Sequence, residues 1–516
     1  MLVQDFLQQS AARLPEKTAL VCDGQRLTYR QLDEMTNRLA QALRENGVRR
    51  GDRVAVFLPN SVYAVAAIFA ILKAGGVFVV VNASTKADKL AYILNNSRAA
   101  ALATTSRNAA LAASLFDEAP SLKFTVLCGP ADRNRDPALA AEKFLDFDAI
   151  QAECPPTAPP CINIDRDLAC LIYTSGSTGE PKGVMSDHSN VDFATSSIIQ
   201  YLGNVEEDVV INVLPLSFDY GLYQLLMVVK FGGTLVLERS FAYPAAILSR
   251  LEEERVTGFP GVPTMFSMLL QMDLGKYDLS SLRYISNTAA ALPPSHIQQL
   301  RARFPGVTLF SMYGLTETKR TLYLPPEQLD QRPGSVGIAI PGTEVWLEDE
   351  AGNRLGPGET GELVVRGRHV MRGYWEAPEA TARRFRSGLI PGEQVCYTGD
   401  LFRMDEDGYL YFVGRKDDII KSRGEKVAPK EVENVLYELE GVIEAAVVGV
   451  PDPVLGEAVK AFLVLDAAEL SEAQVLAHCR SRLEDFMVPK YVEFCAELPK
   501  TTSGKIRKTG LNQPAG

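Results

Sequence analysis

The sequence has few of the residues that build cross-linked or metal-stabilised proteins. Its 516 residues include eight cysteines and four histidines. No two cysteines form a CxxC pair, and no two histidines stand at HxxxH spacing. Scattered cysteines in so long a chain do not make a disulfide scaffold, and the histidines lack zinc-site spacing. We therefore expect idle thiols in a reducing compartment and no zinc held by the protein's own side chains.

The chain also lacks an excess of positive charge and a long apolar run. Its 53 basic and 64 acidic residues give a net charge of −11, which argues against nucleic acid as a partner. The apolar run from Tyr63 is interrupted by Lys73 and by Gly75 and Gly76, so no membrane span is predicted. The first residues show no basic segment followed by an apolar one, so no secretory signal is predicted either. We expect a soluble, cytoplasmic protein.

What is present is an ordinary globular composition in a long chain. Hydrophobic residues make up 46% and charged residues 23%, which excludes wholesale disorder and fibrous repeats. At about 150 residues per domain the length corresponds to roughly three units, although one large α/β domain can count as two. The first half alternates helical and strand-like stretches. Residues 28–48 place Leu32, Met35, Leu39 and Leu43 on one helical face.

This alternation continues and predicts a parallel sheet with helices on both faces. The expected strand–helix–strand units lie in residues 53–82, 98–128 and 205–237. The proline-rich segment 152–164 reads as a connection between subdomains. Residues 357–376 change to short β-type pieces, GELVVRG and VMRGYW, separated by glycines.

The last hundred residues resemble a small α+β unit in their pattern. A helix in 428–439 starts with Pro429, strands follow at 445–450 and 460–465, and Ser471 and Gln474 form a capping box for a second helix. We therefore predict an α/β protein. Its large N-terminal domain, residues 1–415, combines parallel-type sheets flanked by helices with a β-rich subdomain. A small, mobile α+β domain occupies residues 416–516.

The strongest local signal is the segment 171–184, LIYTSGSTGEPKGV. Its glycines let backbone N–H groups converge on an anion, its hydroxyls add donors, and Lys182 adds charge. A Gly/Ser/Thr cluster alone would be an ordinary polar loop, but the Lys182-Gly183 pair after Pro181 favours a phosphate-binding loop. It is not a GxxxxGK[ST] loop, because the lysine is followed by glycine.

The segment YTSGSTGEPKGV resembles the signature of the adenylate-forming superfamily, which includes acyl-CoA synthetases, nonribosomal peptide adenylation domains and firefly luciferase. The resemblance covers nearly the whole chain, because further family motifs follow in order: YGLTE at 313–317, GELVVRG at 361–367, YTGD at 397–400, GRKDDIIKSRGEKV at 414–427 and PKTTSGKIRK at 499–508. It implies that a carboxylic acid attacks the α-phosphate of ATP, with Mg²⁺, to give an acyl adenylate. A thiol of coenzyme A, or of phosphopantetheine on an acyl carrier protein, then displaces AMP.

The resemblance also implies roles for individual residues. Lys505 would bridge the substrate carboxylate and the α-phosphate, Thr316 would reach that phosphate, and Asp417 would be the hinge of the small domain. Asp400 would accept hydrogen bonds from the ribose hydroxyls, with Arg415 as a second cation. Glu317 and Thr178 would hold Mg²⁺. The remaining nucleotide and thiol contacts are assigned to Thr174, Ser175, Gly176, Ser177, Gly179, Lys182, Thr288, Ala289, Ala290, Tyr313 (stacked on adenine), Gly314, Lys421 and Gly424.

The acid itself is left open. The expected pocket residues are Phe218, Asp219, Tyr220, Tyr223, Val262, Thr288 and Met312. Thr288 and Ala289 stand where the family usually has glycine or alanine; they either narrow the pocket or are simply tolerated. Asp219 either holds a substrate amino group, as in amino-acid-activating members, or caps the following helix or makes another polar contact. The alternatives to an acyl–thiol ligase are thus an amino-acid adenylating enzyme that loads a carrier protein and an activator that stops at the adenylate.

Overall fold

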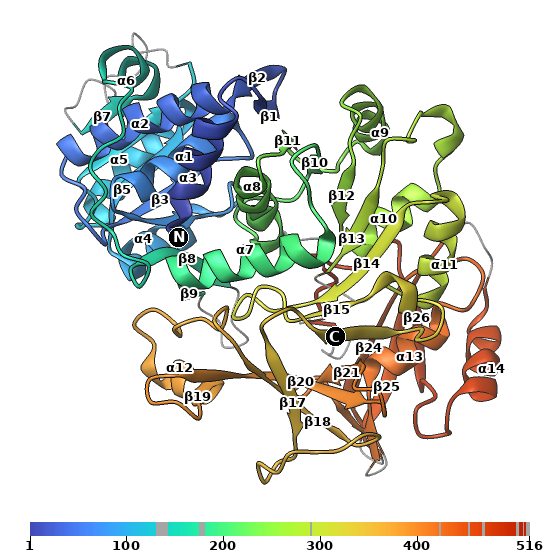
Figure 1. Cartoon of the computed structure of the whole chain (residues 1–516). Helices are drawn as coiled ribbons and strands as arrows, with labels where there is room; N and C mark the ends of the chain where they lie inside the picture. The colour runs from blue at the N-terminus through green and yellow to red at the C-terminus, as the bar shows by residue number, and fades with distance from the viewer. Residues whose placement is uncertain are drawn as a thin grey trace.

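The computed structural model describes residues 1–130, 143–174, 181–288, 292–422, 425–452, 455–466, 470–501, 505–508 and 510–511. These residues form three sheets, of seven, fourteen and five strands (Figure 1). The predicted α/β architecture, with a large N-terminal part and a smaller C-terminal part, is confirmed.

The seven-stranded sheet has the order β7-β6-β5-β3-β4-β8-β9 and is parallel except for the β8–β9 hairpin. Alternate strand residues pack against α2 and α3 on one face and against α4 and α5 on the other. The elements of this layer are α2 (Tyr29–Glu45), β3 (Arg53–Phe57), α3 (Val62–Lys73), β4 (Val77–Val80), α4 (Ala87–Ser97), β5 (Ala99–Thr105), a 3₁₀ turn η1 (Ser106–Asn108), α5 (Ala109–Glu118), β6 (Phe124–Cys128), β7 (Phe144–Asp146), α6 (Phe147–Glu153), β8 (Leu168–Thr174) and β9 (Lys182–Asp187).

The fourteen-stranded sheet has one half that is parallel except for its edge strand β2 and one half that is antiparallel, joined between β14 and β15. Its first half and the helices beside it are α1 (Val3–Arg13), β1 (Thr18–Cys22), β2 (Gln25–Thr28), α7 (His188–Leu202), β10 (Val209–Asn212), α8 (Asp219–Phe231), β11 (Thr234–Leu237), α9 (Pro244–Glu253), β12 (Gly258–Gly261), α10 (Pro263–Leu270), η3 (Leu274–Lys276), β13 (Tyr284–Asn287), α11 (Pro294–Arg303) and β14 (Thr308–Tyr313). The antiparallel half contains β15 (Leu322–Leu324), η4 (Pro326–Gln328), β16 (Ser335–Ala339), β17 (Glu344–Glu348), β18 (Thr360–Arg366), α12 (Pro378–Arg384), β19 (Phe385–Ser387), β20 (Gln394–Met404) and β21 (Leu410–Arg415).

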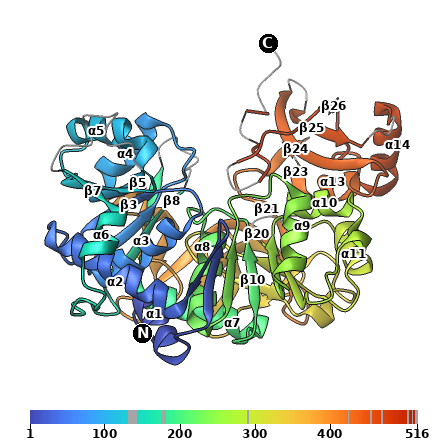
Figure 2. The ribbon, with the colours of Figure 1, turned by 90° about the horizontal axis from the view of Figure 1, so that it is seen from above.

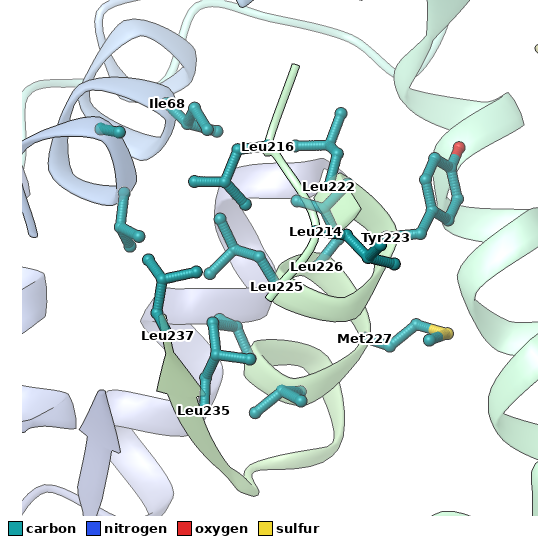
Figure 3. Close-up of a cluster of buried hydrophobic side chains, with 14 of the residues drawn as sticks. Ile68, Leu214, Leu216, Leu222, Tyr223, Leu225, Leu226, Met227, Leu235 and Leu237 are labelled. Atoms are coloured by element: carbon teal, nitrogen blue, oxygen red, sulfur yellow. The ribbon is translucent and has the colours of Figure 1, made fainter. Parts of the chain in front are cut away.

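Helix α8 lies between the two large sheets and is almost wholly buried. Its Leu222 and Leu225 pack with Ile68 of α3 and Leu235 of β11, whereas Tyr223 projects from another side of the helix (Figure 3). Burial of such side chains contributes roughly 1.5–3 kcal/mol each relative to exposure. The helix therefore holds its first turn, where the predicted acid-pocket residues begin, in a fixed position.

The C-terminal part has its own sheet and its own core. It contains β22 (Ile420–Ser422), β23 (Glu425–Val427), α13 (Pro429–Leu436), β24 (Val442–Asp452), β25 (Gly456–Leu465), α14 (Glu472–Arg482) and β26 (Tyr491–Phe494). The Ser471–Gln474 capping box and Pro429 in the first turn of α13 are confirmed. This part lies beside α10 and α11, away from the seven-stranded sheet (Figure 2), and the rings of His296 and Tyr437 meet there at 5.7 Å.

Two local predictions were wrong. The VMRGYW segment is not a strand; only Tyr374 within it makes an isolated bridge, with Val184. The irregular segment 152–164 does not join two subdomains, because α6 before it and β8 after it both belong to the seven-stranded layer. Instead it lies along α2, where Asn37 and Gln41 donate hydrogen bonds to its carbonyl oxygens.

Among the described helices, none is long and apolar enough to cross a membrane. The eight cysteines, all of which are described, are free thiols.

Candidate active site

Asp400 and Arg415 stand directly opposite each other on the antiparallel strands β20 and β21. The Arg415 Nε atom lies 3.8 Å from Oδ1 of Asp400, and the Tyr313 hydroxyl donates a hydrogen bond of 2.6 Å to Oδ2. Burial raises the pKa of Asp400, while Arg415 and the Tyr313 hydroxyl partly offset that rise. Three residues predicted from separate motifs thus meet, with a buried carboxylate able to accept hydrogen bonds from a ligand's hydroxyl groups.

The turn that follows β14 carries Thr316 and Glu317. A Cβ atom on Gly314 would lie 2.1 Å from the carbonyl oxygen of Lys319, so the turn closes only with glycine at this position. Thr316 is partly exposed, whereas Glu317 is buried and accepts a hydrogen bond from the Tyr374 hydroxyl. The turn therefore presents one fixed carboxylate, that of Glu317, which interacts electrostatically with Asp400.

The predicted phosphate loop connects β8 to β9, where Thr174 and Lys182 are cross-strand partners. The Lys182 ammonium lies 5.9 Å from the centre of the Tyr374 ring. Tyr374 thus contacts both the predicted phosphate-binding lysine and Glu317, a link that sequence reasoning missed. The loop residues Ser175, Gly176, Ser177, Thr178 and Gly179 lie outside the described residues, as do Ala289, Ala290 and Gly424.

Arg384, at the end of α12, is a second residue that sequence reasoning missed. Its guanidinium interacts electrostatically with Glu317 and Asp400, and its buried Nε has no hydrogen-bond partner in the described part of the chain. It occupies the space beside Gly399, where an added Cβ would lie 2.4 Å from Nη1 of Arg384. Arg384 and Arg415 therefore act on the buried carboxylates, and Lys182 faces the Tyr374 ring whose hydroxyl binds Glu317; such a group of cations suits a polyphosphate with a bound cation.

The residues present fit a magnesium ion only in combination with phosphate oxygens. Among the described residues no three His, Cys, Asp or Glu side chains gather as a metal site. Mg²⁺ is commonly held by one or two carboxylates plus substrate phosphates, which suits the single buried Glu317. Thr178, the other predicted ligand, lies outside the described residues.

Lys505 reaches this region from the C-terminal tail. Its ammonium lies 5.8 Å from the centre of the Phe218 ring, at the start of α8. A local turn supports it, because the Thr501 amide donates to the Lys505 carbonyl at 2.7 Å and the Lys505 amide donates to the Thr501 hydroxyl at 3.1 Å. Burial lowers the pKa of Lys505, and Asp219 opposes that shift. The tail thus delivers a cation to the large domain.

Asp219 is not a helix cap, contrary to one of the two interpretations of the sequence. Phe218 is the N-cap residue of α8, and the described residues show no side-chain capping bond there. The buried Asp219 carboxylate instead lies 3.6 Å from the Arg320 guanidinium. The other predicted pocket residues are also buried or half-buried: Phe218, Tyr220, Tyr223, Val262, Thr288 and Met312.

The predicted hinge residue Asp417 lies between the two parts of the chain, and the thiol-loop residue Lys421 lies at the start of the second part. Asp417 is exposed in the turn between β21, which belongs to the long sheet, and β22, which belongs to the five-stranded sheet. Lys421 is exposed on β22, where its amide donates a hydrogen bond of 2.7 Å to Glu457. Asp417 is therefore placed where a rotation would reorient the small domain.

Comparisons with known proteins cover the whole chain. The model of the AMP-binding enzyme family matches residues 7–375, and that of the AMP-binding enzyme C-terminal domain matches residues 431–505. A long-chain-fatty-acid–CoA ligase from Bacillus subtilis is 35% identical over 99% of this chain and 94% of its own length. A feruloyl-CoA synthase from Amycolatopsis is 37% identical over 97% of this chain and 96% of its own length.

Solved structures agree with these relatives. The anthranilate CoA ligase AuaEII, in complex with anthranoyl-AMP, superposes with a TM-score of 0.90 at 29% identity, covering 99% of this chain and 96% of its own. ATP-bound MatB from Rhodopseudomonas palustris superposes with a TM-score of 0.88 at 29% identity, covering 99% and 98%.

Proposed function

This chain belongs to the AMP-binding enzyme family and is an AMP-forming acid–thiol ligase, and from this premise we propose that it joins a small carboxylic acid to coenzyme A. The observation that carries the proposal is the position of Lys505. It comes from the end of the chain, yet its ammonium lies over Phe218 and interacts electrostatically with Asp219 and Asp400 of the large domain.

Each half of the reaction has residues suited to it. In the first half, Lys505 offsets the repulsion between the attacking carboxylate and the α-phosphate of ATP, and Asp400 orients the ribose through its hydroxyls. Glu317 would hold Mg²⁺ together with phosphate oxygens, and the bound ion would supply positive charge to the phosphates. In the second half, the small domain rotates at Asp417 and brings the loop containing Lys421 and Gly424 toward the thiol.

Coenzyme A is favoured as the acceptor over a carrier protein by the kinship with several coenzyme A ligases. Amino-acid activation is disfavoured by the Asp219–Arg320 contact, because a carboxylate already paired with a protein cation is less available to a substrate amine. Asp400, Glu317 and Lys505 are all present in the sequence, which disfavours a catalytically inert scaffold.

One panel of acids tests the proposal. Acid-dependent pyrophosphate release is measured with fatty, aryl, dicarboxylic and amino acids, followed by coenzyme A-dependent release of AMP and formation of the thioester. At least one acid should support both steps. Pyrophosphate release without thioester formation would identify an enzyme that stops at the adenylate, and no release with any acid would contradict the proposed function.

Replacing Asp417 by proline is expected to separate the half-reactions. Proline fixes φ near −65° and restricts rotation at this position. Because Lys505 already lies at the large domain, adenylation should survive better than thioester formation. Single-turnover pyrophosphate release and thioester formation from preformed adenylate are measured separately, with Asp417→Ala as a control that leaves rotation free. Equal losses in both half-reactions would show that this position is not the hinge.

Adenylation is expected to fall at alkaline pH, because only the ammonium form of Lys505 attracts two anions. Burial lowers the pKa of Lys505 below its ordinary value near 10.5. The charged form is therefore present at lower pH and is lost as the pH rises through that lowered value, so the decline should begin below pH 10.5. Arginine stays charged throughout, so the residual rate of Lys505→Arg should lack this decline. The same alkaline limb in both proteins would contradict the assignment.

A further inference from the structure

Two adjacent cations, Lys319 and Arg320, are buried directly behind the predicted acid-pocket residues. They follow Glu317 in the turn after β14, and only 1% and 2% of their surfaces are exposed. Lysine and arginine are almost never fully buried unless they are paired. Their burial therefore calls for partners, and the sequence motifs do not account for them.

The backbone holds both side chains in place at a local cost. Lys319 has a φ of 59°, in the left-handed region that most side chains avoid, and its carbonyl group packs against Gly314. The Arg320 Nη1 atom donates a hydrogen bond of 3.0 Å to that same carbonyl. This strained backbone directs two consecutive cations into the interior. Packing alone would not require charged side chains there.

Arg320 has one carboxylate partner. Its guanidinium lies 3.6 Å from Asp219 and 4.4 Å from the centre of the Tyr220 ring. Its buried Nε atom has no hydrogen-bond partner within the described ranges. The arginine is thus neutralised in charge while one of its donors is unused.

Lys319 has no comparable partner. Its ammonium lies 5.5 Å from the centre of the Tyr223 ring, and neither its Nζ atom nor the Tyr223 hydroxyl has a hydrogen-bond partner among the residues described. Burial lowers the pKa of Lys319, and Cys170, Asp219, Glu317 and Arg320 also act on its ammonium electrostatically. Asp219 is already matched by Arg320, and Glu317 accepts from Tyr374. The Lys319 ammonium, the Tyr223 hydroxyl and the Arg320 Nε are therefore three buried donor groups that no described residue uses.

We propose that this distal cluster, made of Lys319, Arg320 and Tyr223, binds a second carboxylate on the substrate, so that the acid is a short dicarboxylate. The inference rests on the proposed function and names the substrate class of the same site. Lys505 and Arg320 both interact with Asp219, so the reacting end and the distal cluster both lie near this one side chain. The first carboxylate meets Lys505 and the second meets Lys319, whose unpartnered ammonium it supplies with an acceptor.

The wild-type enzyme tests this directly. Succinate, glutarate and adipate are each compared with their monomethyl esters, which keep the chain length but lose the second charge. We expect kcat/KM for one diacid to exceed that of its ester by about 10²- to 10³-fold, because the ester leaves a buried cation unpaired. The inference would be overturned if the esters, or unbranched monoacids of equal length, had kcat/KM values equal to those of the diacids. The proposed function would still stand in that case. Failure of every acid would remove both.

A matched pair of variants identifies the residue responsible. Lys319→Met keeps the length of the side chain and removes its charge, and should lower the diacid-to-ester ratio by about 10²-fold or more. Lys276→Met, at an exposed lysine paired with Asp273, should leave that ratio unchanged. Thermal unfolding and ATP binding of both variants report on the fold. A ratio unaltered in a folded Lys319→Met protein would overturn the assignment, and if that variant does not fold, the wild-type comparison decides.

Discussion

Replacing Lys505 by alanine is expected to lower the rate of acid-dependent pyrophosphate release by about 10²- to 10³-fold, the effect of removing one pre-placed donor from a developing charge. The structure places this ammonium over Phe218 and near Asp219, where we propose that the acid and the α-phosphate meet. ATP binding and stability should change little, because the side chain belongs to a short tail segment rather than to a core. Stopped-flow or single-turnover pyrophosphate release measures the loss.

The C-terminal tail offers its own control for this change. Lys500 lies on the same segment but forms an ion pair with Glu444 of the small domain, away from the site. Lys500→Ala should therefore retain the adenylation rate. Thioester formation from preformed acyl adenylate should also persist in Lys505→Ala, since the lysine serves the first half-reaction. Parental pyrophosphate release by Lys505→Ala would remove the catalytic role of this residue.

The parts of the site that the sequence predicted are those carried by contiguous motifs. Asp400 and Arg415 lie in separate motifs, yet each motif fixes its own turn or strand, and the β20–β21 pairing brings them together. Tyr374 and Arg384 were missed because their importance arises only in the folded chain. Tyr374 lies far along the sequence from Glu317 and Lys182, and backbone contacts between its segment and β9 bring it to them.

The same distinction applies to the fold. Strict helical spacing and a capping box predicted α2 and α14 well, because both signals are local. VMRGYW has β-forming residues, but its backbone hydrogen bonds go to β9 at isolated points: the Met185 amide donates to Gly373 and the Trp375 amide donates to Gly183. Pairing between distant segments, rather than composition, decides such cases.

Asp219 shows how a residue can be noticed in the sequence while its partner is not. An aspartate before an apolar helix suggests a helix cap or a ligand for a substrate amine. Both interpretations are based only on residues next to Asp219 in the sequence. Arg320 stands about a hundred residues later and is adjacent to a family motif without belonging to it. The two residues meet only in the folded chain, where the first residue of α8 contacts the turn that follows β14.

Replacing Asp219 by alanine is accordingly expected to cost about 3–5 kcal/mol of folding stability, because it leaves Arg320 and Lys319 buried with no carboxylate between them. Denaturant unfolding measures this loss. The double variant Asp219→Ala, Arg320→Met removes both charges and should regain much of the stability, as neutral replacements of buried ion pairs commonly do. Simple addition of the two single losses would contradict the pairing.

The same variant separates the two remaining roles of Asp219 in catalysis. If Asp219 bound a substrate amine, its loss would depress kcat/KM for an amine-bearing acid and spare the desamino analogue. The ion-pair reading predicts instead that both acids of a matched pair are affected alike, because the displaced Arg320 disturbs the site whichever acid is bound. It further predicts that a diacid is spared more than its ester in Asp219→Ala, since the second carboxylate can take the place of the missing one beside Lys319 and Arg320. If kcat/KM fell only for the amine-bearing acid, amino-acid activation would again be the favoured function. The assignment of a second substrate carboxylate to Lys319 and Arg320 would then be wrong.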